Sequence, residues 1–193
     1  MSQTKDRIIR VLVEHIKQGN NLNELSLSKI AQEAEIGKST VYEHFKSKED
    51  MISSTYAYLL NQYKTILLEP IEMKDFKASF KAQILRILFV MRDAKNIMDA
   101  IMDIQLDGIP SLKQEHQALM ENIQTEMNAR FIEIMKLGVH SKEFNPSSMN
   151  PYAKYIIQSL ISGLLLSYLK EDMGLTEDGI TDLIYNQVLK ALN

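Results

Sequence analysis

Apolar residues recur along most of the chain at intervals of three and four residues, which is the spacing of helices with one buried face. In the first such segment, Ile8, Leu12 and Ile16 share a face. Glycines and prolines stand between several of these segments, where they end helices. The pattern predicts helices over Lys5–Gln18, Leu27–Ala34, Gly37–Phe45, Ser47–Leu68, Lys74–Asp93, Asn96–Leu106, Ser111–Leu137, Pro151–Glu171 and Thr176–Leu192.

The composition agrees with an all-α fold. The chain has 193 residues with only seven Gly and four Pro, which are few for a loop-rich β fold. A chain of this length can bury a substantial hydrophobic core without disulfide bonds to stabilise it. The absence of Cys excludes disulfides, thiolate chemistry and Cys-based zinc sites, and it fits a reducing cytoplasm.

The most apolar run, residues 155–169, is interrupted by Gln158 and three serines. A membrane-spanning helix needs about 20 predominantly apolar residues, so we interpret this run as a buried helix. The polar start, MSQTKDR, lacks the apolar core of a signal peptide. We therefore expect a cytoplasmic protein without a membrane partner.

The segment from Leu27 to Met51 has the layout of a helix-turn-helix, which places its second helix in the DNA major groove. Val41 and Phe45 are four residues apart and are expected to face the core. Polar side chains then remain near the outer face, where they can donate to phosphate oxygens and base edges. These are Lys38, Ser39, Thr40, Tyr42 and His44. The same pattern, taken alone, also fits a solvated helix face.

Charge is distributed in a way that permits DNA binding. The whole chain has a net charge of −3, which is weak evidence against a nucleic-acid partner. Within residues 36–48, however, there are three basic residues, Lys38, Lys46 and Lys48, and one acidic residue, Glu43, so the net charge there is positive. A local positive charge of this kind is sufficient for the few phosphate contacts of one docking face.

The order of residues in this segment resembles a known signature. Ile30-Ala31, Ala34 and the run from Lys38 to Glu49 match I-A-x-x-A-G-V-S-x-G-T-L/V-Y-x-H-F-x-S-K-E, the helix-turn-helix pattern of TetR-type repressors. A weaker likeness lies at residues 142–144 and 150–151, which resemble the G-E-F…D-P loop before the dimer-forming helices of that family. With the nine-helix pattern, the resemblance covers the whole chain.

The resemblance implies a helix-turn-helix DNA-binding domain of three helices over residues 1–48. It implies a helical ligand-binding and dimerisation domain over residues 49–193. The expected function is a ligand-responsive transcriptional regulator, foremost a repressor that a small molecule releases from a pseudo-palindromic operator. No cofactor, metal or catalytic residue is expected. The DNA-binding residues carried over by position are Ser28, Lys38, Ser39, Thr40, Tyr42, His44 and Lys48.

Three positions depart from the family pattern. Glu35 stands where the family has its turn glycine, and Gly37 stands where it has its serine cap. If the turn keeps a left-handed residue, Glu35 bears a strain of about 1–2 kcal/mol. Ser39 replaces the glycine early in the recognition helix, so its side chain changes the fit to DNA at that point.

The C-terminal half offers a reason for homodimer formation, which the resemblance also implies. Residues 155–169 are apolar on nearly all sides, and a helix of this kind must be buried. Small residues within it allow another helix to approach closely. Burial within one subunit is the alternative. The expected interface residues are Ser159, Ser162, Gly163, Leu166, Ile184 and Val188.

A pocket for the effector is expected among the middle helices, because Met adapts its shape and often lines permissive sites. The effector is expected to be apolar or amphipathic. The same Met-rich stripe also fits an ordinary core, and His116 fits the protein surface as well as a pocket. The candidate pocket residues are Phe89, Met91, Met98, Met102, His116, Met127 and Phe131.

Two other functional classes deserve comparison. An all-helical enzyme has little support, because the four His residues are far apart and no H-E-x-x-H, G-x-S-x-G or Gly-rich phosphate loop is present. The alternative within the same family is a DNA-binding protein whose regulatory domain engages a protein partner instead of a small ligand.

Overall fold

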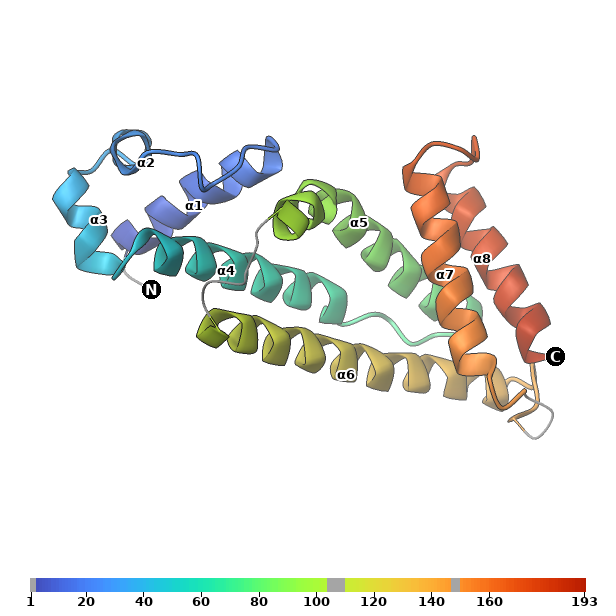
Figure 1. Cartoon of the computed structure of the whole chain (residues 1–193). Helices are drawn as coiled ribbons and strands as arrows, with labels where there is room; N and C mark the ends of the chain where they lie inside the picture. The colour runs from blue at the N-terminus through green and yellow to red at the C-terminus, as the bar shows by residue number, and fades with distance from the viewer. Residues whose placement is uncertain (1–2, 104–109, 147–149) are drawn as a thin grey trace. The chain divides into compact units, whose positions relative to one another are not determined.

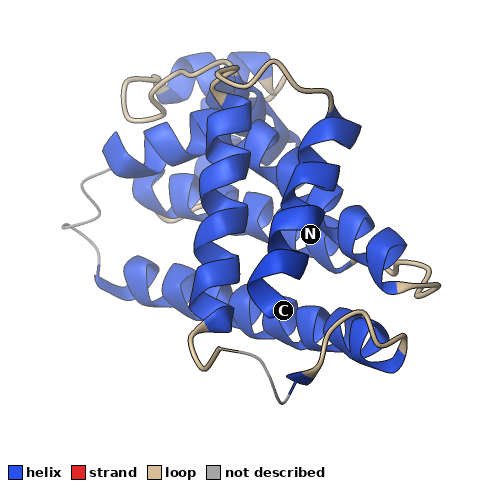
Figure 2. Cartoon of the chain, turned by 90° about the vertical axis from the view of Figure 1, so that its right-hand side faces the viewer, coloured by secondary structure: helices blue, strands red, loops and turns tan. Residues whose placement is uncertain are grey.

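A computed structural model describes residues 3–103, 110–146 and 150–193, with side chains described at 3–95, 117–146 and 150–193. Every regular element in these ranges is a helix (Figures 1 and 2). In chain order the helices are α1 (Gln3–Lys17), α2 (Leu27–Glu33), α3 (Lys38–His44), α4 (Lys48–Leu68), α5 (Phe76–Asp103), α6 (Pro110–His140), α7 (Ala153–Leu169) and α8 (Glu177–Leu192). The expected all-α class is confirmed.

One expected helix boundary is wrong. The pattern predicted two helices, Lys74–Asp93 and Asn96–Leu106, but α5 continues without a break to Asp103. The two residues between the predicted helices, Ala94 and Lys95, are good helix formers, so nothing there stops the helix. The described residues therefore form eight helices rather than nine.

Side-chain caps fix where several helices begin. The Ser26 Oγ accepts a hydrogen bond from the Lys29 N–H at 3.1 Å, at the start of α2. The Ser47 Oγ accepts from the Asp50 N–H at 3.1 Å, at the start of α4. Each cap satisfies an N–H that has no partner within its helix.

The chain divides into two compact units. Unit 1 consists of residues 1–65 and 93–123, and unit 2 consists of residues 66–92 and 124–193. Helices α4, α5 and α6 each begin in one unit and continue into the other. The functional boundary expected after residue 48 is a different division and stays a prediction.

The core of unit 2 is built around aromatic rings. The Phe76 ring lies 5.4 Å from the Phe144 ring and 5.6 Å from the Tyr185 ring, measured between centroids. Phe80 adds a fourth ring, and α7 packs along α8 beside this cluster (Figures 1 and 2). In the described part of the chain, no helix combines the length and the apolar character needed to cross a membrane.

Candidate nucleic-acid interface and ligand cavity

Helix α3 is fixed in unit 1 by two side chains one turn apart. Val41 and Phe45 are 1% and 2% exposed, and the same core includes Ile30 of α2 and Ala34 directly after it, both fully buried. Helices α1, α2 and α3 contact one another (Figure 1). The predicted core positions Val41 and Phe45 are confirmed, so the register of α3 and its outward face follow from the sequence.

The outer face of α3 is polar, as predicted. Tyr42 is 55% exposed although it is a large aromatic side chain. Lys38 and Ser39 are also exposed, while Thr40 and His44 are half-buried. Side chains at these positions can present hydroxyl, imidazole and ammonium donors to a nucleic acid from one short helix.

Two further predicted DNA-binding residues flank this face. Ser28 is exposed near the start of α2. Lys48 is half-buried, and its Nζ donates a hydrogen bond to the Asn23 carbonyl at 2.6 Å. The loop before α2 therefore holds the Lys48 ammonium just beyond the C-terminal end of α3.

The turn between α2 and α3 keeps a left-handed residue, as the departure at Glu35 suggested. Glu35 has φ of 55°. Its N–H donates to the Gln32 carbonyl at 3.0 Å, and the Ile36 N–H donates to the Ala31 carbonyl at 2.9 Å. These two bonds form a Schellman motif, whose left-handed position favours glycine. Glu35 consequently carries backbone strain of about 1 kcal/mol.

Polar contacts tie α1 to the helix-turn-helix. The His15 Nε2 lies 2.6 Å from the Glu33 Oε2, and the Arg7 Nη1 donates to the Ala34 carbonyl at 3.4 Å. The Lys5 ammonium stands 5.0 Å from the centroid of the Phe45 ring. These contacts join residues distant in sequence, which is why sequence reasoning did not find them.

A second group of contacts in unit 1 connects α1, α4 and α5. The Lys17 Nζ lies 3.3 Å from the Asp93 Oδ1, and the Tyr63 OH donates to the Asp93 Oδ2 at 2.9 Å. Burial, together with the acceptor carboxylate of Asp93, raises the pKa of Tyr63 well above its ordinary value. Tyr63 thus remains a neutral donor, which suits its bond to a carboxylate.

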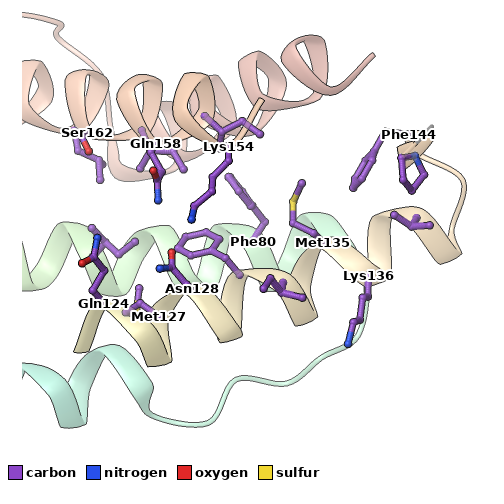
Figure 3. A pocket seen from close by; sticks show the side chains of 18 of the residues that line it. Phe80, Gln124, Met127, Asn128, Met135, Lys136, Phe144, Lys154, Gln158 and Ser162 are labelled. Carbon is purple, nitrogen blue, oxygen red and sulfur yellow. The ribbon is translucent and has the colours of Figure 1, made fainter. Parts of the chain in front are cut away.

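Unit 2 contains a cavity of about 570 Å³, lined by α5, α6, α7 and residues 144–146 (Figure 3). The buried side chains of Phe80, Ile161 and Leu165 form part of its wall. The volume lies within the range of about 300–1,000 Å³ that small-molecule sites occupy.

The predicted pocket residues fall into three groups. Met91, Met127 and Phe131 line the cavity. Phe89 is 54% exposed and is not part of the lining. The side chains of Met98, Met102 and His116 lie outside the described residues.

Sequence reasoning missed the polar side chains of the lining. Gln124 and Asn128 are one turn apart on α6, and Lys154 and Gln158 are one turn apart on α7. Figure 3 shows these pairs extending toward one another from the two helices. Their four-residue spacing was visible in the sequence, but nothing local indicated that the two helices face each other.

Three side chains of α5 and α6 bind the C-terminal end of α4 and form what we term the α4 carbonyl clamp. Its acceptors are the four successive carbonyls of residues 67–70. Gln83 Nε2 donates to the first at 3.0 Å, and Arg130 Nη2 and Nη1 donate to the next two at 2.7 and 2.8 Å. Arg86 Nη2 donates to the fourth at 2.9 Å. Cationic donors are favourable here because carbonyls at a helix C-terminus lack helical partners and carry partial negative charge.

The clamp touches the cavity lining directly. The Gln83 Nε2 also lies 3.6 Å from the Sδ of Met127, which lines the cavity. Arg130 precedes Phe131, another lining residue, on α6. A shift of these lining side chains would therefore reach the groups that hold α4.

Helix α7 has an outer face that carries exposed apolar side chains. Tyr152, Tyr155 and Leu166 are 69%, 65% and 50% exposed, and Ile156 is 42% exposed. A Cβ atom added at Gly163 would meet nothing within 4 Å. The outer face therefore offers open apolar surface around a small residue.

The predicted interface residues divide between this surface and the core. Ser159, Ser162, Gly163 and Leu166 are exposed, but Ser162 lines the cavity. Ile184 and Val188 instead belong to the core of unit 2 and are 0% exposed, so that part of the interface prediction is corrected. The reason is that α8 turns its most apolar face inward, where α7 and the aromatic cluster cover it.

The helix-turn-helix segment is similar in sequence to a known family. Residues 18–55 match the model of the bacterial regulatory proteins of the tetR family. No curated protein sequence matches the chain.

Solved structures of several transcriptional regulators have a similar fold at low sequence identity. A tetR-family transcriptional regulator from Streptomyces coelicolor has a TM-score of 0.68 at 15% identity, covering 100% of this chain and 81% of that one. A TetR transcription regulator from Haloarcula marismortui has a TM-score of 0.69 at 13% identity, covering 100% and 99%. The regulator FadR from Bacillus subtilis, solved in complex with stearoyl-CoA, has a TM-score of 0.54 at 20% identity, covering 96% of both chains.

The predicted resemblance is thus confirmed. The helix-turn-helix segment carries the tetR-family sequence, and the chain as a whole has the fold of TetR-family transcriptional regulators.

Proposed function

We propose that this chain, a TetR-family protein by its helix-turn-helix sequence and its fold, is a ligand-responsive transcriptional repressor that leaves its operator when a small molecule binds. The observation that carries the proposal is the exposed polar face of α3, fixed by buried Val41 and Phe45 in a segment that matches the tetR family. Such a face is the working part of a helix-turn-helix.

In the proposed complex, α3 enters the major groove. Its N-terminal residues, Lys38, Ser39 and Thr40, approach base edges and the nearby backbone. Tyr42, His44 and Lys48 donate chiefly to phosphates, with Ser28 on a neighbouring phosphate. The positive charge of residues 36–48 supports this orientation, because the phosphate backbone supplies much of the affinity.

The operator is read by a homodimer in this proposal. The exposed apolar face of α7, with open space at Gly163, supports a second copy as its partner. A two-fold dimer presents two α3 helices, which read half-sites about 34 Å apart along the duplex. The expected operator is therefore a pseudo-palindrome.

The effector is proposed to bind in the cavity of unit 2. A largely apolar, partly open cavity of this volume is the kind of site that small molecules occupy, which supports a small-molecule effector. FadR of similar fold was crystallised with stearoyl-CoA, which supports an amphipathic molecule.

The α4 carbonyl clamp gives a physical route from the cavity to the DNA-binding segment. Helix α4 begins next to α3, and the clamp holds its C-terminal end. We propose that a ligand displaces Met127 and Phe131, that Gln83 and Arg130 follow, and that α4 acts as a lever. The ligand shifts the equilibrium only as far as its affinities for the two states differ.

The test is selection of genomic fragments by the purified protein, beside a Lys38→Ala/Tyr42→Ala variant altered only at exposed positions. The proposal expects a pseudo-palindromic site with the wild type and none with the variant. The affinity of the wild-type protein for this site should fall steeply as the salt concentration rises. Equal enrichment by both proteins, or no enrichment by either, would overturn the assignment of α3 as the recognition helix.

A further inference from the structure

We infer that the cavity of unit 2 takes an amphiphile with an anionic head group, and that Lys154 binds that head group. The inference rests on the proposed function, which assigns an effector to this cavity, and it adds the chemical class of that effector. The lining includes two lysines, and no Asp or Glu belongs to it among the described residues. The charge of the site therefore favours an anion over a cation.

The two lysines are not equivalent. The Lys136 Nζ lies 2.7 Å from the Glu133 Oε1, so its charge is already paired at the surface. Lys154, by contrast, has no carboxylate partner within the described part of the chain. Figure 3 shows Lys154 reaching from α7 toward α6, while Lys136 extends away from the other labelled side chains.

Amide groups surround the position that Lys154 reaches. Gln158 follows it by one turn on α7, and Asn128 stands on the facing α6 (Figure 3). An ammonium with amide N–H donors forms charge-assisted hydrogen bonds to a carboxylate or phosphate. The combination is suited to an anion at one side of the cavity.

The remaining wall favours a hydrocarbon chain. Phe80, Ile161 and Leu165 are buried, and Met91, Met127 and Phe131 complete an apolar surface. These side chains offer no strong hydrogen-bond partner, whereas each buried CH₂ contributes favourable transfer free energy. Thioether side chains also adapt to chains of different length. The chemistry shared by suitable ligands is thus an alkyl chain attached to an anionic head group, which is a carboxylate in a free fatty acid and the phosphates of CoA in an acyl-CoA thioester.

Direct fluorescence titration with cis-parinaric acid and its methyl ester separates the head group from the chain. For the wild type, the acid should bind about tenfold more tightly than the neutral ester, because only the acid gains a charge-assisted bond. Lys154→Met should remove about tenfold of the affinity for the acid and leave the ester unchanged. Lys154→Arg should restore binding of the acid, and Lys136→Met, the matched control, should leave both affinities unchanged.

Equal binding of acid and ester by the wild type would overturn the inference. So would unchanged affinity of Lys154→Met for the acid, or a failure of the acid to bind the wild type. Competition by palmitate or by palmitoyl-CoA then identifies whether a free acid or a thioester is preferred, and either preference supports the inference.

These titrations contain no DNA, so their outcome is separate from that of the proposed function. An acid that binds through Lys154 without altering operator affinity would contradict the regulatory role and leave the inference standing. A neutral compound that releases the operator, with no binding of the acid, would support the regulatory role and overturn the inference.

Discussion

The segment α2–α3 and the cavity of unit 2 are built in opposite ways. The candidate DNA-binding face lies almost entirely on α3, a helix of seven residues, and two buried side chains set its orientation. The cavity is assembled from three helices and a loop that are far apart in sequence. A local site is therefore determined by residue spacing, whereas a distributed site depends on how whole helices pack.

Packing differs between the two regions as well. The core beneath α3 is closed, with Ile30 and Val41 at 0% and 1% exposure. Beside Phe80, unit 2 instead leaves about 570 Å³ unfilled. The apolar side chains that line this partly open cavity forgo contacts that a filled core would make. The open volume therefore supports a role in binding.

The largest effect is expected on operator affinity, from substitutions in the candidate DNA-binding face at α3. Replacing Tyr42 by Phe and Lys48 by Ala removes two proposed phosphate contacts from each subunit, which should weaken operator binding by about 3 kcal/mol per dimer. The dependence of affinity on salt should become shallower. Fluorescence anisotropy with a labelled operator measures both quantities. Unaltered binding would remove these residues from the interface, and Lys190→Ala on α8 serves as the control.

The second largest effect is expected in the aromatic core beside the cavity, where a substitution at Gly138 should lower stability. A Cβ at Gly138 would collide with Phe144 and would stand 3.0 Å from the Phe76 Cγ. Gly138→Ala should therefore lower the free energy of unfolding by about 2 kcal/mol. Gly163→Ala, which meets nothing within 4 Å, should not destabilise the subunit but should weaken the proposed dimer. Denaturant titration and analytical ultracentrifugation distinguish the two, and equal losses of stability would contradict this packing.

A smaller effect tests the connection between the two sites. Arg130→Met removes two hydrogen bonds to the end of α4. Ligand affinity should stay the same, while the change in operator affinity that the ligand causes should shrink by about 1 kcal/mol. The control is Arg92→Met, which breaks the surface pair with Glu177 at 2.8 Å. An undiminished ligand response in Arg130→Met would exclude the clamp as the route.

The smallest effect concerns the strained turn of the local site. Glu35→Gly should raise the free energy of unfolding by less than about 1 kcal/mol. The relief of backbone strain in the folded state exceeds the cost of the greater conformational entropy that glycine gives the unfolded chain. Glu35→Ala removes the charge but keeps a Cβ at φ of 55°, so it should give no comparable gain. Thermal unfolding followed by circular dichroism measures the difference. A lower melting temperature for Glu35→Gly would contradict the strained conformation.

The same contrast explains what the sequence could predict. The buried positions Val41 and Phe45 and the left-handed Glu35 depend on neighbours within a few residues, and all three agree with the structure. Ile184 and Val188 were assigned to a dimer interface because an apolar stripe alone does not say which neighbour covers it. Lys154 was missed because its place in the cavity depends on how α7 lies opposite α6, which no local pattern indicates.

The central claim is that occupancy of the cavity and binding of DNA by α3 are coupled. It is tested most directly by measuring four affinities: of the operator with and without a ligand that competes with cis-parinaric acid, and of that ligand with and without the operator. Linkage requires that each partner weaken the other by the same factor. The account predicts a common factor well above one, and the factor should diminish in Arg130→Met. Operator affinity that is the same with the cavity filled and empty would contradict it.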